Sequence, residues 1–310
     1  MKTMDEIVRV ENLYVIFGEF AAVKDVSFSV PRGEIFGFLG ANGAGKTTTI
    51  RVLCGLLPAS KGKVVIDGIE FVKGRENEVK ARVGYMSQKF TLYDDITINE
   101  NLAFAAALRR IPRDVFKKRK AELLDFIGFK EKTNSVVRDL PGGIKQEIAL
   151  VASMMHDPQI IFLDEPTAGV SPAARDKFWK LIRELSARGK TVFVTTHYMD
   201  EAENCNRIAL MRSGELIALD SPENLKNKTF SKNMYLVKVN DENARARLLE
   251  QKDSLFEMLT PYGLNYHALV KDGMNEADVC AQIDRDIGMM DPIRPSLEDV
   301  FVTLVEGKTR

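Results

Sequence analysis

The sequence has no long apolar run, few cysteines and no excess of charge of either sign, and each absence excludes a class of protein. No stretch approaches the ~18 apolar residues of a membrane-spanning helix, so a membrane role would require another chain. The 44 basic residues balance 44 acidic ones, which argues against a nucleic-acid partner. Residues 1–10 carry charges where a signal peptide needs an apolar stretch, so we expect no secretory leader there.

Cysteine usage indicates a reducing compartment. The three cysteines, Cys54, Cys205 and Cys280, are far apart and lack the spacing of a metal site. We therefore expect neither a disulfide framework nor a cysteine-bound metal. A chain of 310 residues, 45% of them hydrophobic, is long enough for one large core and a smaller second domain.

Apolar strand-like runs alternate with helical stretches, which predicts an α/β fold. The segment from about residue 98 to 155 is helical by period, and we expect it to be a helical subdomain inserted between two strands. The expected strands are 8–10, 22–30, 35–39, 63–66, 160–163, 191–195 and 207–212, and the expected helices are 47–57, 172–188 and 199–204.

The pattern restarts near residue 230, which predicts one domain over 1–229 and a small α/β accessory domain over 230–310. We expect this second domain to be regulatory or to stabilise a dimer. Its expected elements are a strand at 234–239, a charged helix at 242–259, a strand at 264–270, a helix from 275, and a last helix capped by Ser296 with the apolar stripe Leu297, Val300, Phe301 and Leu304.

The most informative motif is a glycine-rich loop between a strand and a helix. Residues 40–47 read GANGAGKT. Glycines let such a loop turn tightly and aim its N–H groups inward, so that the loop and the helix N-terminus cradle the α and β phosphates of a nucleotide. We expect Lys46 to reach the β and γ phosphates and Thr47 to bind Mg²⁺. The predicted nucleotide-binding residues of the loop are Asn42, Gly43, Ala44, Gly45, Lys46, Thr47 and Thr48.

Polar residues at the ends of three strands complete a nucleotide site: the expected strands 160–163 and 191–195, and a further expected strand within residues 83–88 that ends at Gln88. We expect Asp164 to hold Mg²⁺ through water and Glu165 to polarise the water that attacks the γ-phosphate. Gln88 is placed to bind Mg²⁺ and the same water, and His197 to hydrogen-bond the γ-phosphate. Each is weak alone, because paired acids, a loop glutamine or a strand-end histidine are common structural features.

A second glycine motif, LPGGI at residues 140–144, opens a helix about twenty residues before the Asp164 strand. N–H groups at a helix start again suit an anion. In this order, the motifs resemble those of the ATP-binding cassette (ABC) ATPases, over about residues 8–228. The strings THYMDEAE at 196–203 and PSLEDVF at 295–301 are similar to the drug-resistance and small-molecule efflux branch.

The resemblance implies an α/β P-loop NTPase fold, ATP and Mg²⁺ as ligands, and Mg²⁺-dependent hydrolysis. It implies catalytic roles for Glu165, His197 and Gln88 and metal roles for Thr47, Gln88 and Asp164. In this family two such domains dimerise head to tail, so Pro141, Gly142 and Gly143 would complete the other copy's site. The dimer, of two copies or with a sister subunit, drives a separate membrane permease from the cytoplasmic face, where we expect this chain to lie peripherally.

Two surface roles follow from the same resemblance. Phe17, an aromatic residue just before a glycine, is expected to stack on adenine; the alternative is that it lies in the core. The surface after Gln88, with Phe90, Leu92 and Tyr93, is expected to receive a cytoplasmic helix of the permease.

Three residues depart from the family pattern, all in parts that act across the dimer. Pro141 replaces a serine, Ser171 replaces an aspartate, and Glu147 replaces an arginine, which would bring a negative charge near the approach of the phosphates. The chain therefore looks better equipped to use its own ATP than to complete a second site. The alternatives are a regulatory module that hydrolyses little ATP, and an ABC protein of translation or DNA repair, whose tandem cassette or long coiled-coil insertion this chain lacks.

Overall fold

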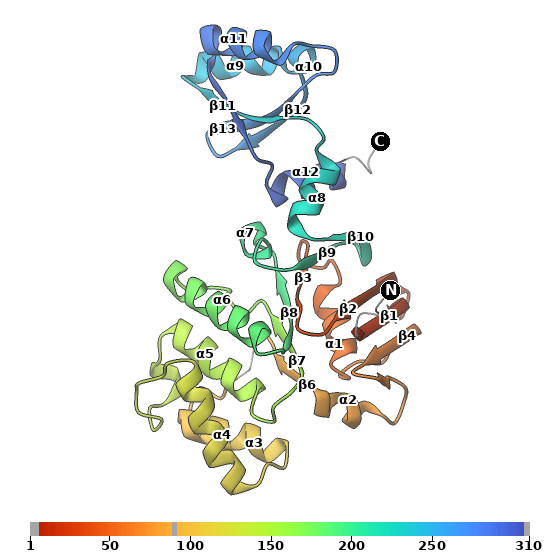
Figure 1. The fold of residues 1–310 in the computed structure, drawn as a ribbon, viewed down its shortest axis with the longest axis vertical. Helices are drawn as coiled ribbons and strands as arrows, with labels where there is room; N and C mark the ends of the chain where they lie inside the picture. The colour runs from red at the N-terminus through yellow and green to blue at the C-terminus, as the bar shows by residue number, and fades with distance from the viewer. Residues whose placement is uncertain (1–5, 89–91, 307–310) are drawn as a thin grey trace. The chain divides into compact units, whose positions relative to one another are not determined.

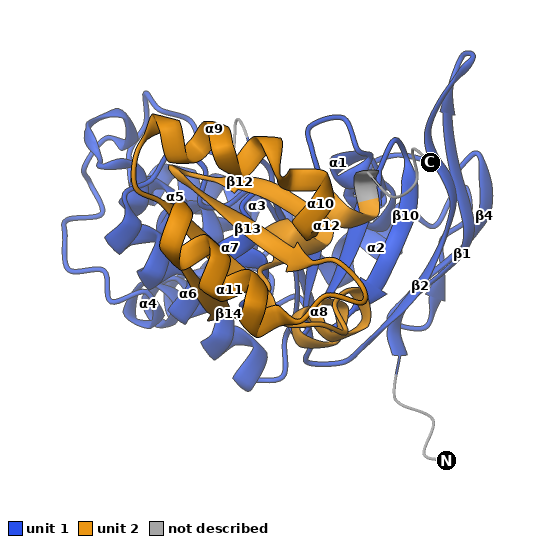
Figure 2. Ribbon diagram, turned by 90° about the horizontal axis from the view of Figure 1, so that it is seen from above, with its two compact units in different colours: residues 1–221 blue, residues 222–310 orange. Residues whose placement is uncertain are grey.

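The chain divides into two compact units in this computed structural model, which describes residues 6–88 and 92–306. The first unit is Met1–Ser221 and the second is Pro222–Arg310 (Figure 2). The division falls before helix α8 (Pro222–Thr229), whereas the sequence analysis places the boundary after that segment. Each unit has its own buried core.

A six-stranded sheet forms the centre of the first unit (Figure 1). Its strand order is β10-β9-β3-β8-β7-β6, and the five strands from β9 to β6 are parallel, with β10 antiparallel at the edge. The strands are β3 (Ile35–Leu39), β6 (Val83–Met86), β7 (Ile160–Asp164), β8 (Thr191–Thr196), β9 (Arg207–Arg212) and β10 (Glu215–Asp220).

The central strands β3, β7 and β8 are buried at every position, as expected for parallel strands with both faces covered. Phenylalanines fill the space between them: the rings of Phe162 and Phe193 stack at 4.6 Å, and that of Phe36 lies 5.4 Å from Phe193. Because the parallel strands end at one edge, the loops after β3, β6, β7 and β8 meet there.

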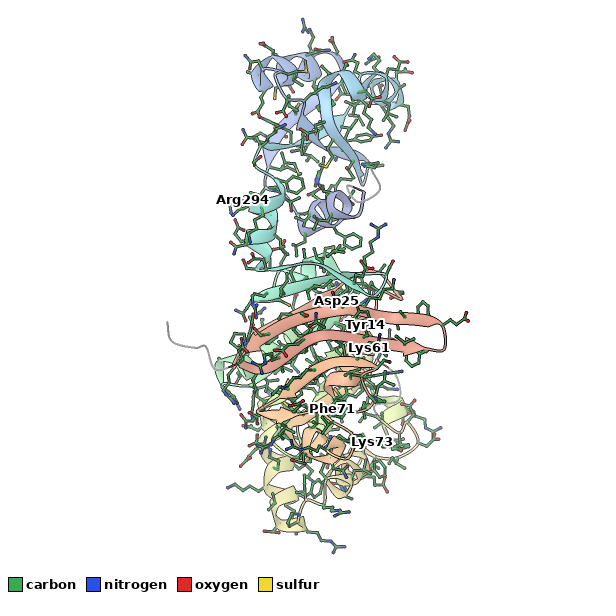
Figure 3. The ribbon with its side chains drawn as sticks, turned by 90° about the vertical axis from the view of Figure 1, so that its right-hand side faces the viewer. Tyr14, Asp25, Lys61, Phe71, Lys73 and Arg294 are labelled. Carbon is green, nitrogen blue, oxygen red and sulfur yellow. The ribbon has the colours of Figure 1, made fainter. Side chains whose placement is uncertain are left out.

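A second, antiparallel sheet with the order β2-β1-β4-β5 shares this core, since Phe28 stacks on Phe36. Val8, Val10 and Val15 of β1 are buried in this core, while Arg9, Glu11 and Asn12 are exposed. On the exposed face the ammonium of Lys61 lies over the ring of Tyr14 (Figure 3). The elements of this part are β1 (Glu6–Phe17), β2 (Phe20–Pro31), α1 (Lys46–Leu53), β4 (Lys61–Ile66), β5 (Ile69–Glu70) and α2 (Glu76–Arg82).

Helices occupy the segment between the neighbouring strands β6 and β7. They are α3 (Ile98–Leu108), α4 (Arg113–Phe126), the short 3₁₀ helix η1 (Val137–Asp139) and α5 (Gly142–Ser153). Thr97 and Glu100 form a capping box that fixes the start of α3. Helices α6 (Pro172–Ala187) and α7 (Met199–Ala202) complete the unit. Among the described residues, no helix has both the length and the apolar character to cross a membrane.

The second unit has a four-stranded antiparallel sheet in the order β12-β13-β11-β14. The element order β-α-β-β-α-β and this strand order make a ferredoxin-like arrangement. Apolar residues of α9, α10 and α11 pack on one face of the sheet. The elements are β11 (Met234–Val239), α9 (Glu242–Glu250), α10 (Lys252–Leu255), β12 (Phe256–Tyr262), β13 (Asn265–Val270), α11 (Glu276–Asp286), β14 (Gly288–Ile293) and α12 (Leu297–Glu306).

One expected helix of this unit is wrong in its extent. The stretch 242–259 is helical only to Leu255, and β12 begins at Phe256. A register irregularity between Phe256 and Met258 breaks the strand's alternation, so Phe256 and Leu259, three residues apart, are both buried as they would be on a helix face. The cap of α12 is confirmed, because the amide of Asp299 donates to the Ser296 hydroxyl at 3.2 Å.

Candidate functional site

The glycine-rich loop connects the end of β3 to α1 at the edge where the parallel strands finish. Gly43 and Gly45 have φ values of 81° and 103°, in the left-handed region that favours glycine. A side chain at Gly45 would also meet the carbonyl oxygen of Ala22 at 2.8 Å. The first N–H groups of α1 have no acceptor within their own helix, so the loop presents donors to an anion.

Lys46 is almost fully buried within this loop. Its ammonium donates to the carbonyl oxygens of Gly40 and Ala41, at 2.7 and 3.2 Å. Burial lowers the pKa of Lys46, while the negative charges of Glu165 and Asp164 oppose that shift. Because these acceptors are neutral carbonyl groups, the ammonium keeps its positive charge for a ligand. Together with the backbone N–H groups of the loop, it suits a multiply charged phosphate.

Thr47 and Asp164 lie together at the start of α1 and the end of β7. The Thr47 hydroxyl donates to Oδ1 of Asp164 at 3.1 Å, and the carboxylate is buried. Both are hard oxygen donors of the kind that Mg²⁺ prefers, and a buried carboxylate needs a cationic or hydrogen-bonding partner. The pair therefore fits a magnesium ion.

Glu165, Gln88 and His197 converge on one carboxylate oxygen. The Gln88 amide donates to Oε2 of Glu165 at 2.7 Å, and Nδ1 of His197 lies 3.5 Å from the same atom. The structure thus brings together the three residues predicted for catalysis. Within the described residues, the Gln88 side chain contacts Glu165 and not Thr47 or Asp164. Its role as a metal ligand therefore stays a prediction.

The backbone of Glu165 is in the left-handed region, with φ of 48°. A residue with a β-carbon seldom adopts this conformation, and such strain is concentrated at functional sites. Here it turns the chain sharply after β7, and the Glu165 amide donates to Thr195 Oγ1 at 2.9 Å.

Two polar residues of this site are missing from the sequence analysis. The Thr195 hydroxyl donates to Oδ1 of Asp164 at 2.6 Å, and the Tyr85 hydroxyl lies 3.4 Å from Oδ2. Burial, followed by the charge of Asp164, raises the pKa of Tyr85, so the phenol stays protonated as a donor. The available signal was a threonine inside a run of buried apolar residues, since such a hydroxyl needs a partner.

The glycine motif at residues 140–144 opens α5 as expected, with Pro141 as its N-terminal cap residue. Ser171 has a local role, because its hydroxyl accepts from the Ala174 amide at 3.4 Å and caps α6. The buried carboxylate of Glu147 pairs with Lys177 of α6 at 2.7 Å, so its charge is balanced within the chain. Its place near the phosphates of a second cassette stays a prediction.

Phe17 ends β1 and is half exposed. The alternative that it lies in the core is therefore wrong, while its role in stacking stays a prediction. Phe90 lies outside the described residues. Tyr93 is exposed, its amide donates to Asn101 Oδ1 at 2.7 Å, and its ring meets that of Phe104 edge-on at 5.1 Å.

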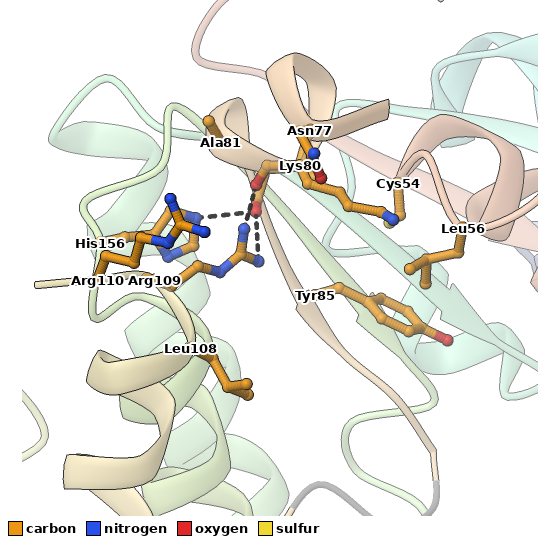
Figure 4. Close-up of a pocket in the computed structure, with 11 residues that line it drawn as sticks. Cys54, Leu56, Asn77, Lys80, Ala81, Tyr85, Leu108, Arg109, Arg110 and His156 are labelled. Carbon is orange, nitrogen blue, oxygen red and sulfur yellow. Dashed lines mark hydrogen bonds between the residues drawn. The ribbon is translucent and has the colours of Figure 1, made fainter. Parts of the chain in front are cut away.

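Next to this aromatic pair is a hollow of about 820 Å³ between β6 and the helical segment. Figure 4 shows Arg109 and His156 on one side of it and Tyr85 and Leu56 on the other. The Arg109 guanidinium donates to the carbonyl of Lys80, and Nε2 of His156 lies 3.0 Å from the Val83 carbonyl. Among the described residues, no carboxylate lines this hollow, so its charge is positive.

The site can be compared with known proteins. A profile of the ABC transporter family matches residues 23–168. The "Nod factor export ATP-binding protein I" of Ralstonia nicotianae is 34% identical over 310 residues, which cover 98% of this chain and 95% of that protein. The chain belongs to the ABC transporter family. The predicted family, with its efflux branch, is confirmed.

Two other ABC relatives match about 70% of this chain. The "Probable multidrug ABC transporter ATP-binding protein YbhF" of Escherichia coli is 42% identical over 222 residues, covering 72% of this chain. That match spans only 38% of YbhF. The "Linearmycin resistance ATP-binding protein LnrL" of Bacillus subtilis is 37% identical over 221 residues, which are 71% of this chain and 70% of LnrL.

Solved ABC structures confirm the fold. The ADP conformation of MJ1267, an ATP-binding cassette of an ABC transporter, has a TM-score of 0.65 at 27% identity, covering 71% of this chain and 92% of that one. A dimeric post-hydrolysis state of the cassette MJ0796, bound to ADP and Pi, has a TM-score of 0.62 at 27% identity, covering 69% and 98%.

Proposed function

We propose that this chain binds ATP with Mg²⁺ at the 40–47 loop and hydrolyses it to power efflux through a separate membrane permease. One observation carries the proposal: Asp164, which contacts Thr47, is followed in sequence by Glu165, which contacts Gln88 and His197. Phosphoryl transfer to water requires residues that bind Mg²⁺ and, next to them, a carboxylate that can orient and polarise the water.

The loop and Lys46 bind and orient the phosphates, and the exposed ring of Phe17 stacks on the base. Glu165 is the general base, since its carboxylate accepts a proton from the attacking water while Gln88 orients that water. His197 donates to the γ-phosphate. Thr47 and Asp164 would hold Mg²⁺, which would supply positive charge to stabilise the charge that develops on the phosphate.

The partner of the hydrolysis cycle is a permease docked beside Tyr93 and Phe104, on the cytoplasmic face of the membrane. Exposed aromatic rings next to a cationic hollow suit an amphipathic helix with acidic residues. A second cassette, either another copy or a sister subunit, is the other partner, and the dimeric relative MJ0796 supports this arrangement. The exporter names of the relatives support efflux as the direction.

Two substitutions test the binding and chemical steps separately. Lys46→Ala removes a charge-assisted contact of about 1.5–3 kcal/mol, so nucleotide affinity should fall at least about ten-fold. Glu165→Gln spares the phosphate loop, so binding should persist while turnover falls roughly 10²–10⁴-fold. Glu184→Gln on the exposed face of α6 is the matched control and should do neither.

The measurements are nucleotide affinity by calorimetry and phosphate release at steady state. Unchanged turnover in Glu165→Gln would remove this residue from the role of base. Tight binding with scarcely any turnover in the wild-type chain would favour the regulatory module instead.

A further inference from the structure

Glu201, in the short helix α7, has a buried carboxylate with two hydroxyl donors. Thr167 Oγ1 donates to Oε1 at 2.5 Å, and Thr196 Oγ1 donates to Oε2 at 2.8 Å. Glu201 is 2% exposed and both threonines are 1% exposed. A carboxylate removed from water to this extent is retained only with such partners.

The two threonines belong to the two loops that bear the candidate catalytic residues. Thr167 is two residues after Glu165, and Thr196 comes directly before His197. Strand pairing joins these segments only as far as Asp164 and Thr195. Beyond that point, the Glu165 amide donates to Thr195 Oγ1, and the Glu165 carboxylate lies near the His197 ring. The Glu201 carboxylate adds a further connection, because it accepts from Thr167 on one loop and from Thr196 on the other.

Arg175 of α6 supplies the positive charge of this arrangement. Its Nε lies 3.1 Å from Oε1 of Glu201, and its guanidinium lies 4.5 Å from the centre of the Tyr198 ring. The Tyr198 ring in turn contacts that of His197, with 4.1 Å between the centroids. Glu201 is thus linked to His197 through Thr196, the residue before it in the chain. Arg175 is linked to His197 through the ring of Tyr198.

We propose that Glu201 is a positioning residue, whose carboxylate sets the distance between the Glu165 carboxylate and the His197 imidazole by fixing Thr167 and Thr196. The inference rests on the proposed function of that pair in ATP hydrolysis. Small displacements of reacting groups cost large factors in rate, whereas nucleotide binding depends on the separate 40–47 loop. Loss of Glu201 should therefore affect turnover and not affinity.

The first test compares Glu201→Ala and Glu201→Gln with a matched control in the full chain. Glu34 is the control: it is also a buried acid of the first unit, paired with Arg207 at 2.7 Å, but it precedes β3 and so lies at the opposite edge of the sheet. In Glu201→Ala, kcat should fall at least about ten-fold while KM for ATP stays within about two-fold of wild type. Glu201→Gln keeps one acceptor for a threonine, so it should recover part of kcat. Glu34→Gln should leave kcat unchanged.

A second readout needs no hydrolysis. The chain has three histidines, so imidazole resonances can be assigned one by one by NMR. Glu201→Ala should shift the ring signals of His197 and leave those of His267 in place, and Glu34→Gln should shift neither. This separates the inference from the proposed function: absent wild-type turnover would refute hydrolysis, while the His197 signals would still report on Glu201.

Wild-type kcat and unshifted His197 signals in Glu201→Ala would overturn the inference, as would an equal loss of kcat in Glu34→Gln. If Glu201→Ala fails to fold, Thr167→Val and Thr196→Val each remove one hydroxyl while keeping the side-chain shape. Each should lower kcat and move the His197 signals. Unchanged kcat and signals in both would also overturn the inference.

Discussion

Replacing Pro141 with serine tests whether the proline at the start of α5 slows hydrolysis across a cassette dimer. Pro141 offers neither an N–H nor a hydroxyl group to a phosphate. A charge-assisted hydrogen bond of at least about 1.5 kcal/mol, if made in the transition state, corresponds to roughly a ten-fold rate increase. If two copies of this chain form the dimer, we therefore expect Pro141→Ser to raise the ATPase rate of the isolated protein about ten-fold.

The same substitution also changes the stability of α5. Pro141 is the N-terminal cap residue, with φ of −56° and ψ of 146°, and serine there would accept a hydrogen bond from the first turn. This gains about 0.5–2 kcal/mol, offset by about 0.4–1 kcal/mol from the more flexible unfolded chain. The net change is within about 1.5 kcal/mol, so the melting temperature should move by less than about 6 °C.

Pro112 provides the matched control. It is the cap residue of α4, with φ of −58° and ψ of 150°, and so nearly the same backbone. Pro112→Ser should shift the melting temperature as Pro141→Ser does but leave turnover unchanged. The assay is steady-state phosphate release with a thermal melt on the same samples. Equal ATPase rates in wild type and Pro141→Ser would refute the reasoning and mean that Gly142 and Gly143 supply enough donors.

The remaining predictions concern the surface near the helical segment. Tyr93→Ala should reduce co-purification with membranes and any stimulation of the ATPase by the permease, while Leu264→Ala, at a more exposed site in the second unit, should not; intact recruitment would place docking elsewhere. Burial, followed by the charge of Arg109, lowers the pKa of His156 from 6.5 to about 4. The unfolded chain therefore takes up this proton first, so stability present above pH 6.5 is lost as pH falls toward 4. His156→Gln should reduce that loss in urea midpoints measured across this pH range, and an identical pH dependence would contradict the assignment.

Much of the fold and the candidate site could be predicted because the relevant signals are local. Gly43 and Gly45 are required by backbone conformation at their own positions, and the strand before Asp164 is a short apolar run. The convergence of Gln88, Glu165 and His197 followed from one rule, that parallel strands end at the same edge of a sheet.

The rest depends on contacts between residues distant in sequence. The start of β12 was hidden because an irregularity gives Phe256 and Leu259 a helical spacing. The roles of Thr195 and Glu201 appear only when β7, β8 and α7 are assembled, since a hydroxyl or carboxylate does not indicate its partner. Likewise, nothing beside Glu147 in the sequence indicates Lys177, thirty positions away on another helix.

The ion pair of Glu147 and Lys177 limits which substitutions this chain can accept in evolution. Arginine at position 147 alone, as in the efflux branch that the sequence resembles, would bury a second cation beside Lys177 between α5 and α6. The Lys177 side chain is 44% exposed, so solvent screens part of the repulsion. Leaving a buried charged group without its partner still costs about 1–3 kcal/mol, which is a noticeable part of the stability of a typical domain. Substitutions at positions 147 and 177 should therefore occur together. In an alignment of related sequences, these two positions should covary, which would reflect the contact between the two helices.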